Sequence, residues 1–216
     1  MTLLLLLISS ISVVIMHRLR PSASPQNFQP ADPTTNAPEP SILGKKLAKA
    51  LPDSMIFPQS TREFKKSIGS YWAQQECEVL PACIVRPHDA QELSKAIAII
   101  KGEYDKQKEQ AGKGKTKGLF AIRGGGHSPV SGAASIKGGV LIDLGLLCEV
   151  ILSDDRSSVT IGGGAKWMDV SKVLDEQGLA VVGGRNSPVG VGGSTLGGES
   201  LLLSGFRSIL RSSRYL

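Results

Sequence analysis

The chain of 216 residues has little of what several classes of protein depend on. Its three cysteines cannot form a disulfide-rich scaffold. Aromatic residues make up only 5% of the sequence, so the stacking surfaces that bind single-stranded nucleic acid are scarce. Two segments, 101–117 and 207–216, carry the whole net charge of +6, which leaves no basic stripe for a folded surface. We therefore expect no nucleic-acid partner, and we assign no metal site.

Long apolar runs are also missing. A membrane-spanning helix needs about 20 apolar residues, whereas the longest run, Leu3 to Met16, is shorter and contains three serines. Its length suits the hydrophobic core of a secretory signal peptide. Arg18 and Arg20 follow this run instead of preceding it, which weakens the prediction of cleavage. We predict a signal peptide, with a short anchor as the alternative, no stable membrane span, and a protein that is secreted or enters the secretory pathway.

Composition divides the chain into five parts. The stretch that ends at Pro40 is rich in proline and poor in apolar side chains, so it cannot bury enough surface to fold. The next part carries a helical pattern, and the glycine-rich part after it reads mostly as short strands. We predict a signal peptide or short anchor at 1–23, a linker at 24–40, a helical segment at 41–78, a folded domain at 79–198 and a basic tail at 199–216.

The domain at 79–198 begins with a strand–helix–strand pattern, a βαβ unit, and continues with short strands, an order that indicates an α+β fold. Its helix is amphipathic, because the apolar residues from Leu93 to Ile100 recur at helical spacing, and the Lys-rich stretch 101–117 should be an exposed loop. We expect Cys148 to be a buried free thiol. The expected helices include Ile42–Leu51, Arg62–Tyr71 and Trp167–Leu174, and the expected strands are Ala82–Val85, Leu119–Ile122, Val140–Leu144, Cys148–Leu152, Ser158–Ile161 and Leu179–Val182.

Glycine is abundant, and most of the 25 glycines lie between Gly118 and Gly198. They do not match the common nucleotide-binding fingerprints. The sequence Gly114-Lys115-Thr116 lacks the glycine that a P-loop requires five residues earlier, because Glu109 occupies that place. Each G-x-G pair also lacks the third glycine of the dinucleotide-binding fingerprint.

The strongest local pattern is Arg123-Gly124-Gly125-Gly126-His127-Ser128, which directly follows a predicted strand. Three consecutive glycines leave their N–H groups unshielded, and such a loop can form a nest for a phosphate or pyrophosphate. In isolation, the pattern would be interpreted as a turn with a surface histidine. A second segment, Val189-Gly190-Val191-Gly192-Gly193, has glycines too dense for the interior of a strand or helix, and its valines argue against a flexible linker.

Together these patterns resemble the FAD-linked oxidases of the vanillyl-alcohol-oxidase type, and among them the fungal members related to berberine-bridge enzyme. The resemblance covers residues 50–198 approximately and depends on the order and spacing of several motifs. These are Tyr71-Trp72-Ala73-Gln74-Gln75, Pro81-Ala82-Cys83, 123–128, 138–144, 162–167 and 183–193.

The resemblance implies a PCMH-type FAD-binding domain made of two α+β subdomains with FAD between them. Residues 123–128 would bind the cofactor, with Gly124 to Gly126 around the pyrophosphate and His127 attached covalently to the flavin ring. Residues 189–193 would line the flavin from the other side. Asn186 stands where some members have a cysteine that forms a second covalent link, so we expect one attachment only.

The implied activity is that of an oxidase, in which a small-molecule substrate, such as a secondary metabolite, gives a hydride to FAD and oxygen accepts the electrons. The family's substrate domain and catalytic base would follow residue 198. At that point Glu199 departs from the family pattern, and the sequence ends at Leu216. We therefore expect an incomplete flavin-binding chain without its substrate domain, and we name no catalytic residue. Two alternatives stay open: an inactive flavin-binding remnant, and a phosphate-binding module without flavin.

Overall fold

The centre of the fold is a four-stranded sheet with the strand order β1-β2-β4-β3. The computed structural model describes residues 41–111 and 118–198. The four strands are β1 (Met55–Ile56), β2 (Cys83–Val85), β3 (Phe120–Arg123) and β4 (Val140–Asp143). Both β2 and β3 run parallel to β4, and β1 pairs antiparallel with β2. The carboxyl ends of the three parallel strands therefore meet at one edge of the sheet.

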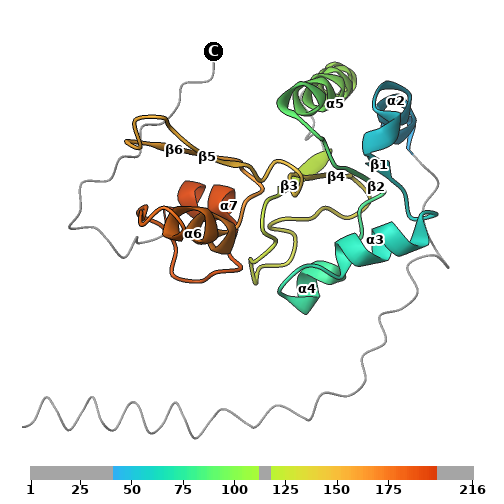
Figure 1. Cartoon of the computed structure of the whole chain (residues 1–216). Helices are drawn as coiled ribbons and strands as arrows, with labels where there is room; N and C mark the ends of the chain where they lie inside the picture. The colour runs from blue at the N-terminus through green and yellow to red at the C-terminus, as the bar shows by residue number, and fades with distance from the viewer. Residues whose placement is uncertain (1–40, 112–117, 199–216) are drawn as a thin grey trace, which may run out of the picture. The chain divides into compact units, whose positions relative to one another are not determined.

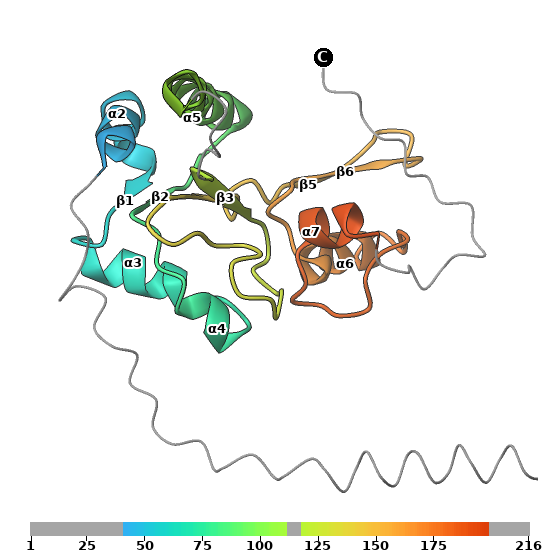
Figure 2. The same ribbon diagram turned by 180° about the vertical axis from the view of Figure 1, so that it is seen from behind.

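Helices cover both faces of this sheet (Figures 1 and 2). Successive side chains of a strand point to opposite faces. Val85 contributes to a core formed with α2 (Ile42–Ala50) and α5 (Ala90–Ala111), whereas Ile84 contributes to a core formed with α3 (Thr61–Ile68). Both side chains are fully buried. A short 3₁₀ turn (Pro52–Ser54) and the short helix α4 (Gln74–Cys77) complete this part of the chain.

A smaller second part follows β4. It contains an antiparallel hairpin and two helices: β5 (Val150–Leu152), β6 (Val159–Ile161), α6 (Trp167–Asp175) and α7 (Val191–Leu196). Buried Trp167 and Val191 join this hairpin and both helices in a third core. The predicted α+β fold with its βαβ part is thereby confirmed, whereas the part after β4, predicted to be rich in strands, contains two strands and two helices within the described residues.

The Lys-rich stretch 101–117 is not an exposed loop along its whole length, because α5 continues as far as Ala111. Two ion pairs support this continuation. Lys101 lies 2.6 Å from Asp105 one turn further along, and Lys46 of α2 lies 2.6 Å from Glu103. Alternating charges on an exposed helical face explain why mean composition alone suggested a loop. The remaining residues, 112–117, lie outside the described part.

Two other predictions were wrong. Leu179–Val182 forms no strand; instead, Leu179 and Val181 pack against the third core. The glycine-rich segment Val191–Leu196 does form a helix, α7. The Ser194 hydroxyl explains this exception, because it accepts a hydrogen bond from Trp167 Nε1 at 2.9 Å and donates one to the Gly190 carbonyl at 2.9 Å. Burial against a tryptophan thus outweighs the low helix propensity of glycine.

Across 41–111 and 118–198, no helix has the length and apolar character needed to cross a membrane. The predicted leader (1–23), linker (24–40) and basic tail (199–216) lie outside the described residues. The predicted helical segment 41–78 also contains β1, which pairs with β2. This segment therefore packs as part of the same sheet as the residues that follow it.

Two glycine-to-alanine substitutions test this packing. A Cβ at Gly164 would collide with the Leu144 carbonyl oxygen, whereas a Cβ at Gly102 in α5 would meet no atom within 4 Å. We expect Gly164→Ala to lower the free energy of unfolding by about 1–3 kcal/mol and Gly102→Ala to raise it by about 0.5–1 kcal/mol. Urea denaturation of the two variants checks both signs. A neutral Gly164→Ala variant would contradict the close approach of these two loops.

Candidate functional site

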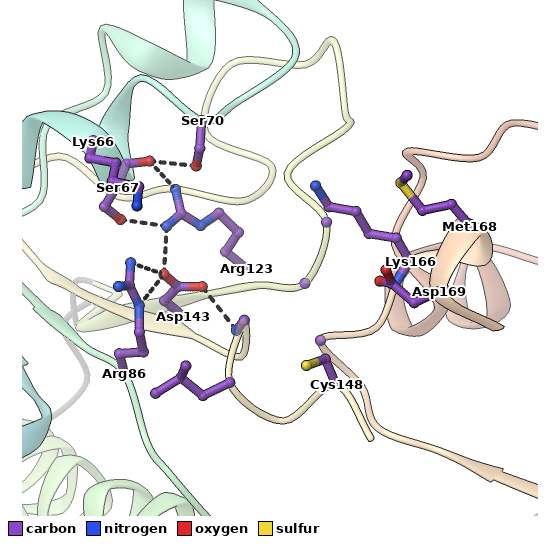
Figure 3. Close-up of a pocket in the computed structure, with 15 residues that line it drawn as sticks. Lys66, Ser67, Ser70, Arg86, Arg123, Asp143, Cys148, Lys166, Met168 and Asp169 are labelled. Carbon is purple, nitrogen blue, oxygen red and sulfur yellow. Dashed lines mark hydrogen bonds and ion pairs between the residues drawn. The ribbon is translucent and has the colours of Figure 1, made fainter. Parts of the chain in front are cut away.

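The carboxyl edge of the sheet gathers three charged residues. Arg86 directly follows β2, Arg123 ends β3 and Asp143 ends β4. The Asp143 Oδ2 atom accepts hydrogen bonds from Arg86 Nε at 2.9 Å, Arg86 Nη2 at 2.8 Å and Arg123 Nη2 at 2.7 Å. Figure 3 shows the carboxylate between the two guanidinium groups. Because ligands of α/β sheets often bind beyond the carboxyl ends of the strands, this edge is where a site is expected.

The Asp143 carboxylate is ionised although it is buried. Burial alone would raise the pKa of Asp143, but the Arg123 and Arg86 guanidiniums outweigh it and hold the pKa below its ordinary value. The second oxygen, Oδ1, accepts a hydrogen bond from the Gly145 N–H at 3.1 Å. One carboxylate thereby fixes residues that follow all three parallel strands.

The Arg123 guanidinium is enclosed by the end of α3 and the residues after it. Its Nη1 donates to the Ser67 carbonyl at 2.7 Å, and its central carbon lies 4.6 Å from the centre of the Tyr71 ring. Only 4% of the residue is exposed. Direct contact of Arg123 with a cofactor stays a prediction. The structure shows that its side chain anchors the start of the glycine loop.

Three glycine-rich loops meet beside this anchor. A Cβ at Gly125 would collide with the Gly190 backbone, and a Cβ at Gly190 would collide with the Gly125 backbone. A Cβ at Gly192 would lie only 2.7 Å from the Gly163 carbonyl oxygen. The structure therefore brings the two predicted motifs, 123–128 and 189–193, against each other. It also adds a third loop, 162–164, which the sequence analysis used for the resemblance but did not name as part of the site.

The first of these loops presents free hydrogen-bond donors. Within the described residues, the backbone N–H groups of Gly124, Gly125, Gly126 and His127 donate to no protein acceptor. Gly126 has a φ of 64°, a conformation that glycine adopts without strain. Consecutive N–H groups of this kind form a concave anion-binding nest. The loop therefore has the donors that a phosphate or pyrophosphate requires.

A cavity of about 410 Å³ adjoins the loop. Gly124 and Gly125 line it from one side, and Lys166, at the start of α6, lines it from the other. Figure 3 shows the Lys166 side chain extending into this space, with Arg86 across from it. The volume lies within the range of roughly 300–1,000 Å³ that is usual for small-molecule sites. The lining has four cationic side chains (Lys66, Arg86, Arg123 and Lys166) and two acidic ones (Asp143 and Asp169), so its net positive charge suits an anionic ligand.

The other predicted site residues have different surroundings. The imidazole ring of His127 stacks on Trp72, with 4.9 Å between the ring centroids, and does not line the cavity. The Ser128 hydroxyl accepts a hydrogen bond from the Val130 N–H. Val189 and Val191 pack in the third core, and Gly193 is exposed on α7. The cofactor contacts of these residues stay predictions.

The sequence analysis missed Arg86, Asp143 and Lys166 at this site. Their pattern was available, since Arg86 and Asp143 each follow or end a predicted strand, but only parallel pairing brings them together. It also placed Cys148 wrongly, because this thiol is exposed at the cavity. Cys83 is the buried thiol, and burial raises its pKa to about 12, so it stays protonated at physiological pH.

The sequence model of a family described as FAD binding domain matches residues 81–212. The chain belongs to this family. The match includes the nest, the cavity-lining residues of the sheet edge and all three glycine loops, and it extends into the segment set apart above as a basic tail. An anion-binding nest beside a cationic cavity fits the pyrophosphate of FAD. The cofactor of the domain is therefore FAD.

Fungal flavoproteins are among the relatives. An FAD-dependent monooxygenase of Penicillium roqueforti is 40% identical over 153 residues, which cover 70% of this chain and 27% of the relative. An FAD-dependent monooxygenase of Cochliobolus heterostrophus is 37% identical over 135 residues, or 62% of this chain and 24% of the relative. This chain thus spans about a quarter of the length of the curated relatives that it matches.

Solved structures show the same fold. The 6-hydroxy-D-nicotine oxidase of Arthrobacter nicotinovorans is 26% identical with a TM-score of 0.51, over 63% of this chain and 26% of that chain. The glucooligosaccharide oxidase of Acremonium strictum, whose FAD is linked to a cysteine and a histidine, is 24% identical with a TM-score of 0.55. That match covers 73% of this chain and 30% of the oxidase. The predicted PCMH-type fold is confirmed.

A substitution at the junction of the glycine loops tests the cofactor site. Gly125→Ala would push Gly190 away and distort the nest, so we expect FAD affinity to fall at least about tenfold, or about 1.4 kcal/mol. Gly102→Ala is the control, because a Cβ at this glycine of α5, outside the predicted site, meets no atom within 4 Å. Flavin fluorescence titration measures both affinities. Equal affinities in the two variants would show that FAD does not depend on the junction.

A second substitution tests the buried carboxylate. Asp143→Asn would leave two guanidiniums without their anion, and we expect a loss of about 3–5 kcal/mol in the free energy of unfolding at pH 7. The control is Asp105→Asn, which removes an exposed ion pair and should cost less than about 1 kcal/mol.

The pH dependence of stability has a defined sign. Folding lowers the pKa of Asp143, so its contribution is present above the ordinary value of 3.8 and is lost as the pH falls below that value. Asp143→Asn should therefore show a shallower loss of stability on acidification than the unmodified chain. Urea titrations from pH 6 to pH 3 would detect this, and parallel curves would refute it.

Proposed function

We propose that this chain is the cofactor-holding part of an FAD-dependent oxidoreductase that oxidises a small organic molecule with oxygen as the electron acceptor. The observation that carries this proposal is the row of unshielded N–H groups from Gly124 to His127, next to a cavity lined by Lys166 and Arg86. Family membership gives the ligand of such a site. The alternative of a phosphate-binding module without flavin is not favoured by that membership.

Different groups of the chain would contact different parts of FAD. Backbone N–H groups of the nest would donate to the pyrophosphate, and the Lys166 ammonium would lie in the same cavity to balance its charge. Asp143 would take no part in binding, since its oxygens already accept from Arg86, Arg123 and Gly145. When bound, FAD supplies the capacity to accept a hydride and return the electrons to oxygen.

His127 is the proposed point of covalent attachment. A nitrogen of its imidazole would form a bond to a methyl carbon of the flavin ring, and the imidazole and the methyl group would each give up one hydrogen. The two electrons removed would pass to molecular oxygen, which leaves as hydrogen peroxide. The glucooligosaccharide oxidase supports this proposal, because its FAD carries a histidyl link. Asn186, in the place of a second attachment, has no sulfur and cannot form a thioether.

The substrate class is proposed from the relatives. The fungal proteins above are named monooxygenases, whereas the solved structures are oxidases of small organic molecules. We propose a small organic substrate, such as a secondary metabolite. Oxygen serves as electron acceptor in the oxidase reaction, and release of hydrogen peroxide without incorporation of labelled oxygen into the product would distinguish this activity from that of a monooxygenase.

Export through the secretory pathway, by a leader at 1–23, is part of the same proposal.

The attachment is tested by His127→Ala. We expect the unmodified chain, incubated with FAD and oxygen, to keep its flavin absorbance after acid precipitation, whereas the variant should release all of its flavin. The nest uses backbone atoms, so His127→Ala should still bind FAD reversibly. Absorbance of the washed precipitate gives the covalent fraction. Acid-labile flavin in the unmodified chain would contradict the proposed attachment.

A further inference from the structure

The imidazole of His127, at the end of the nest, has Trp72 as its ring neighbour among the described residues. The imidazole and the indole are stacked, with 4.9 Å between the ring centroids and 17° between the planes. Trp72 is 63% exposed, so burial in a core does not explain its orientation. Offset stacking of two flat rings at this separation is favourable. It favours imidazole orientations that keep the ring nearly parallel to the indole.

The backbone of Trp72 is tied to the same loop. Its N–H donates to the Gly126 carbonyl at 3.0 Å. Gly126 has a φ of 64° and immediately precedes His127 in the chain. A glycine next to a reactive side chain leaves the backbone more conformational freedom than any other residue would. The hydrogen bond from Trp72 removes part of that freedom at the point where the His127 side chain leaves the backbone.

A wider set of contacts fixes the segment that carries Trp72. We call residues 71–79 the strap. It is hydrogen-bonded to the residues that follow the nest, 129–135, so that the chain is held on both sides of His127. The bonds are Tyr71 Oη to Ala134 O at 2.8 Å, Ala134 N to Glu76 Oε1 at 3.0 Å, Ser135 Oγ to Val79 O at 2.7 Å, Ser131 Oγ to Gln75 O at 3.3 Å and Gln75 Nε2 to Pro129 O.

We propose that Trp72 is a positioning residue that orients the imidazole of His127 for bond formation with the flavin. This inference rests on the attachment proposed above. Bond formation requires the imidazole nitrogen to reach the methyl carbon at near-contact distance and in one direction, and small errors in such geometry cost large factors in rate. The strap fixes the backbone, and the indole ring fixes the plane of the imidazole.

The proposal separates attachment from binding. The nest holds FAD through backbone N–H groups, and Trp72 does not line the cavity. Loss of the indole should therefore slow covalent attachment without an equal loss of reversible affinity. A merely structural role would lower both quantities together, because a distorted loop would also lose the nest.

The experiment compares the full chain with Trp72→Ala, Trp72→Phe and a control, Val130→Ala, which shortens an equally exposed apolar side chain in the segment after His127. Each protein, as the apo form, is mixed with FAD in air-saturated buffer. Fluorescence quenching gives the reversible dissociation constant, and acid-stable flavin over time gives the rate of attachment.

We expect Trp72→Ala to attach flavin at least about tenfold more slowly, with a dissociation constant within about twofold of the parent. Trp72→Phe should recover most of the rate, because an aromatic ring can still stack, and Val130→Ala should match the parent. Three results would overturn the role of Trp72 and leave the proposed attachment intact. They are attachment by Trp72→Ala at the parental rate, equal losses of attachment rate and FAD affinity in Trp72→Ala, and attachment by Trp72→Phe that is no faster than by Trp72→Ala. Absence of acid-stable flavin in the parent would overturn the proposed attachment as well.

Discussion

The buried carboxylate of Asp143 is the interaction on which the site depends. It ends the central strand β4 and binds the guanidiniums that follow β2 and end β3, so it fixes the carboxyl edge of all three parallel strands. Two cations and one anion give this edge a net positive charge, which suits a phosphate-bearing ligand. Removing the carboxylate would leave buried Arg123 and half-buried Arg86 without their anion, whereas removing one arginine would still leave a neutral pair. The arrangement is therefore more sensitive to loss of Asp143 than to loss of Arg86, which is the more exposed of the two arginines.

Glycine is required at the loop junction for a steric reason that differs from the usual one. Gly125 and Gly190 have no positive φ, and another residue could adopt their backbone conformations. What excludes a side chain is the other loop, because each glycine occupies the space where the Cβ of its partner would lie. From the sequence, the resemblance placed Gly125 at the FAD pyrophosphate and Gly190 beside the flavin. The structure shows that close approach of the two loops already requires them.

The parts of the structure that were predictable are those with a local signal. Apolar runs located β2, β3 and β4, and the predicted strands Cys148–Leu152 and Ser158–Ile161 correspond to β5 and β6. The triple glycine after β3 identified the nest, because its conformation depends on adjacent residues. The Arg86–Asp143–Arg123 cluster could not be found in this way, since 57 positions separate Arg86 from Asp143 and only parallel pairing joins them. Helix α7 was missed for a similar reason: its stability comes from Ser194 and distant Trp167, whereas its composition opposes a helix.

The site combines donors that stay unsatisfied within the protein with side chains that are fully satisfied. Four consecutive N–H groups without protein acceptors gain nothing from folding, and in a dry core each would cost about 1–3 kcal/mol. Those of Gly124 and Gly125 are tolerable because these two residues line an open cavity where water or a ligand can accept from them. The neighbouring polar side chains, in contrast, have hydrogen-bond partners within the protein. The guanidinium of Arg123 and the carboxylate of Asp143 are buried and bond to each other and to nearby residues. A rigid, internally satisfied edge thus presents a row of free donors in a fixed geometry, which lowers the ordering cost when FAD binds.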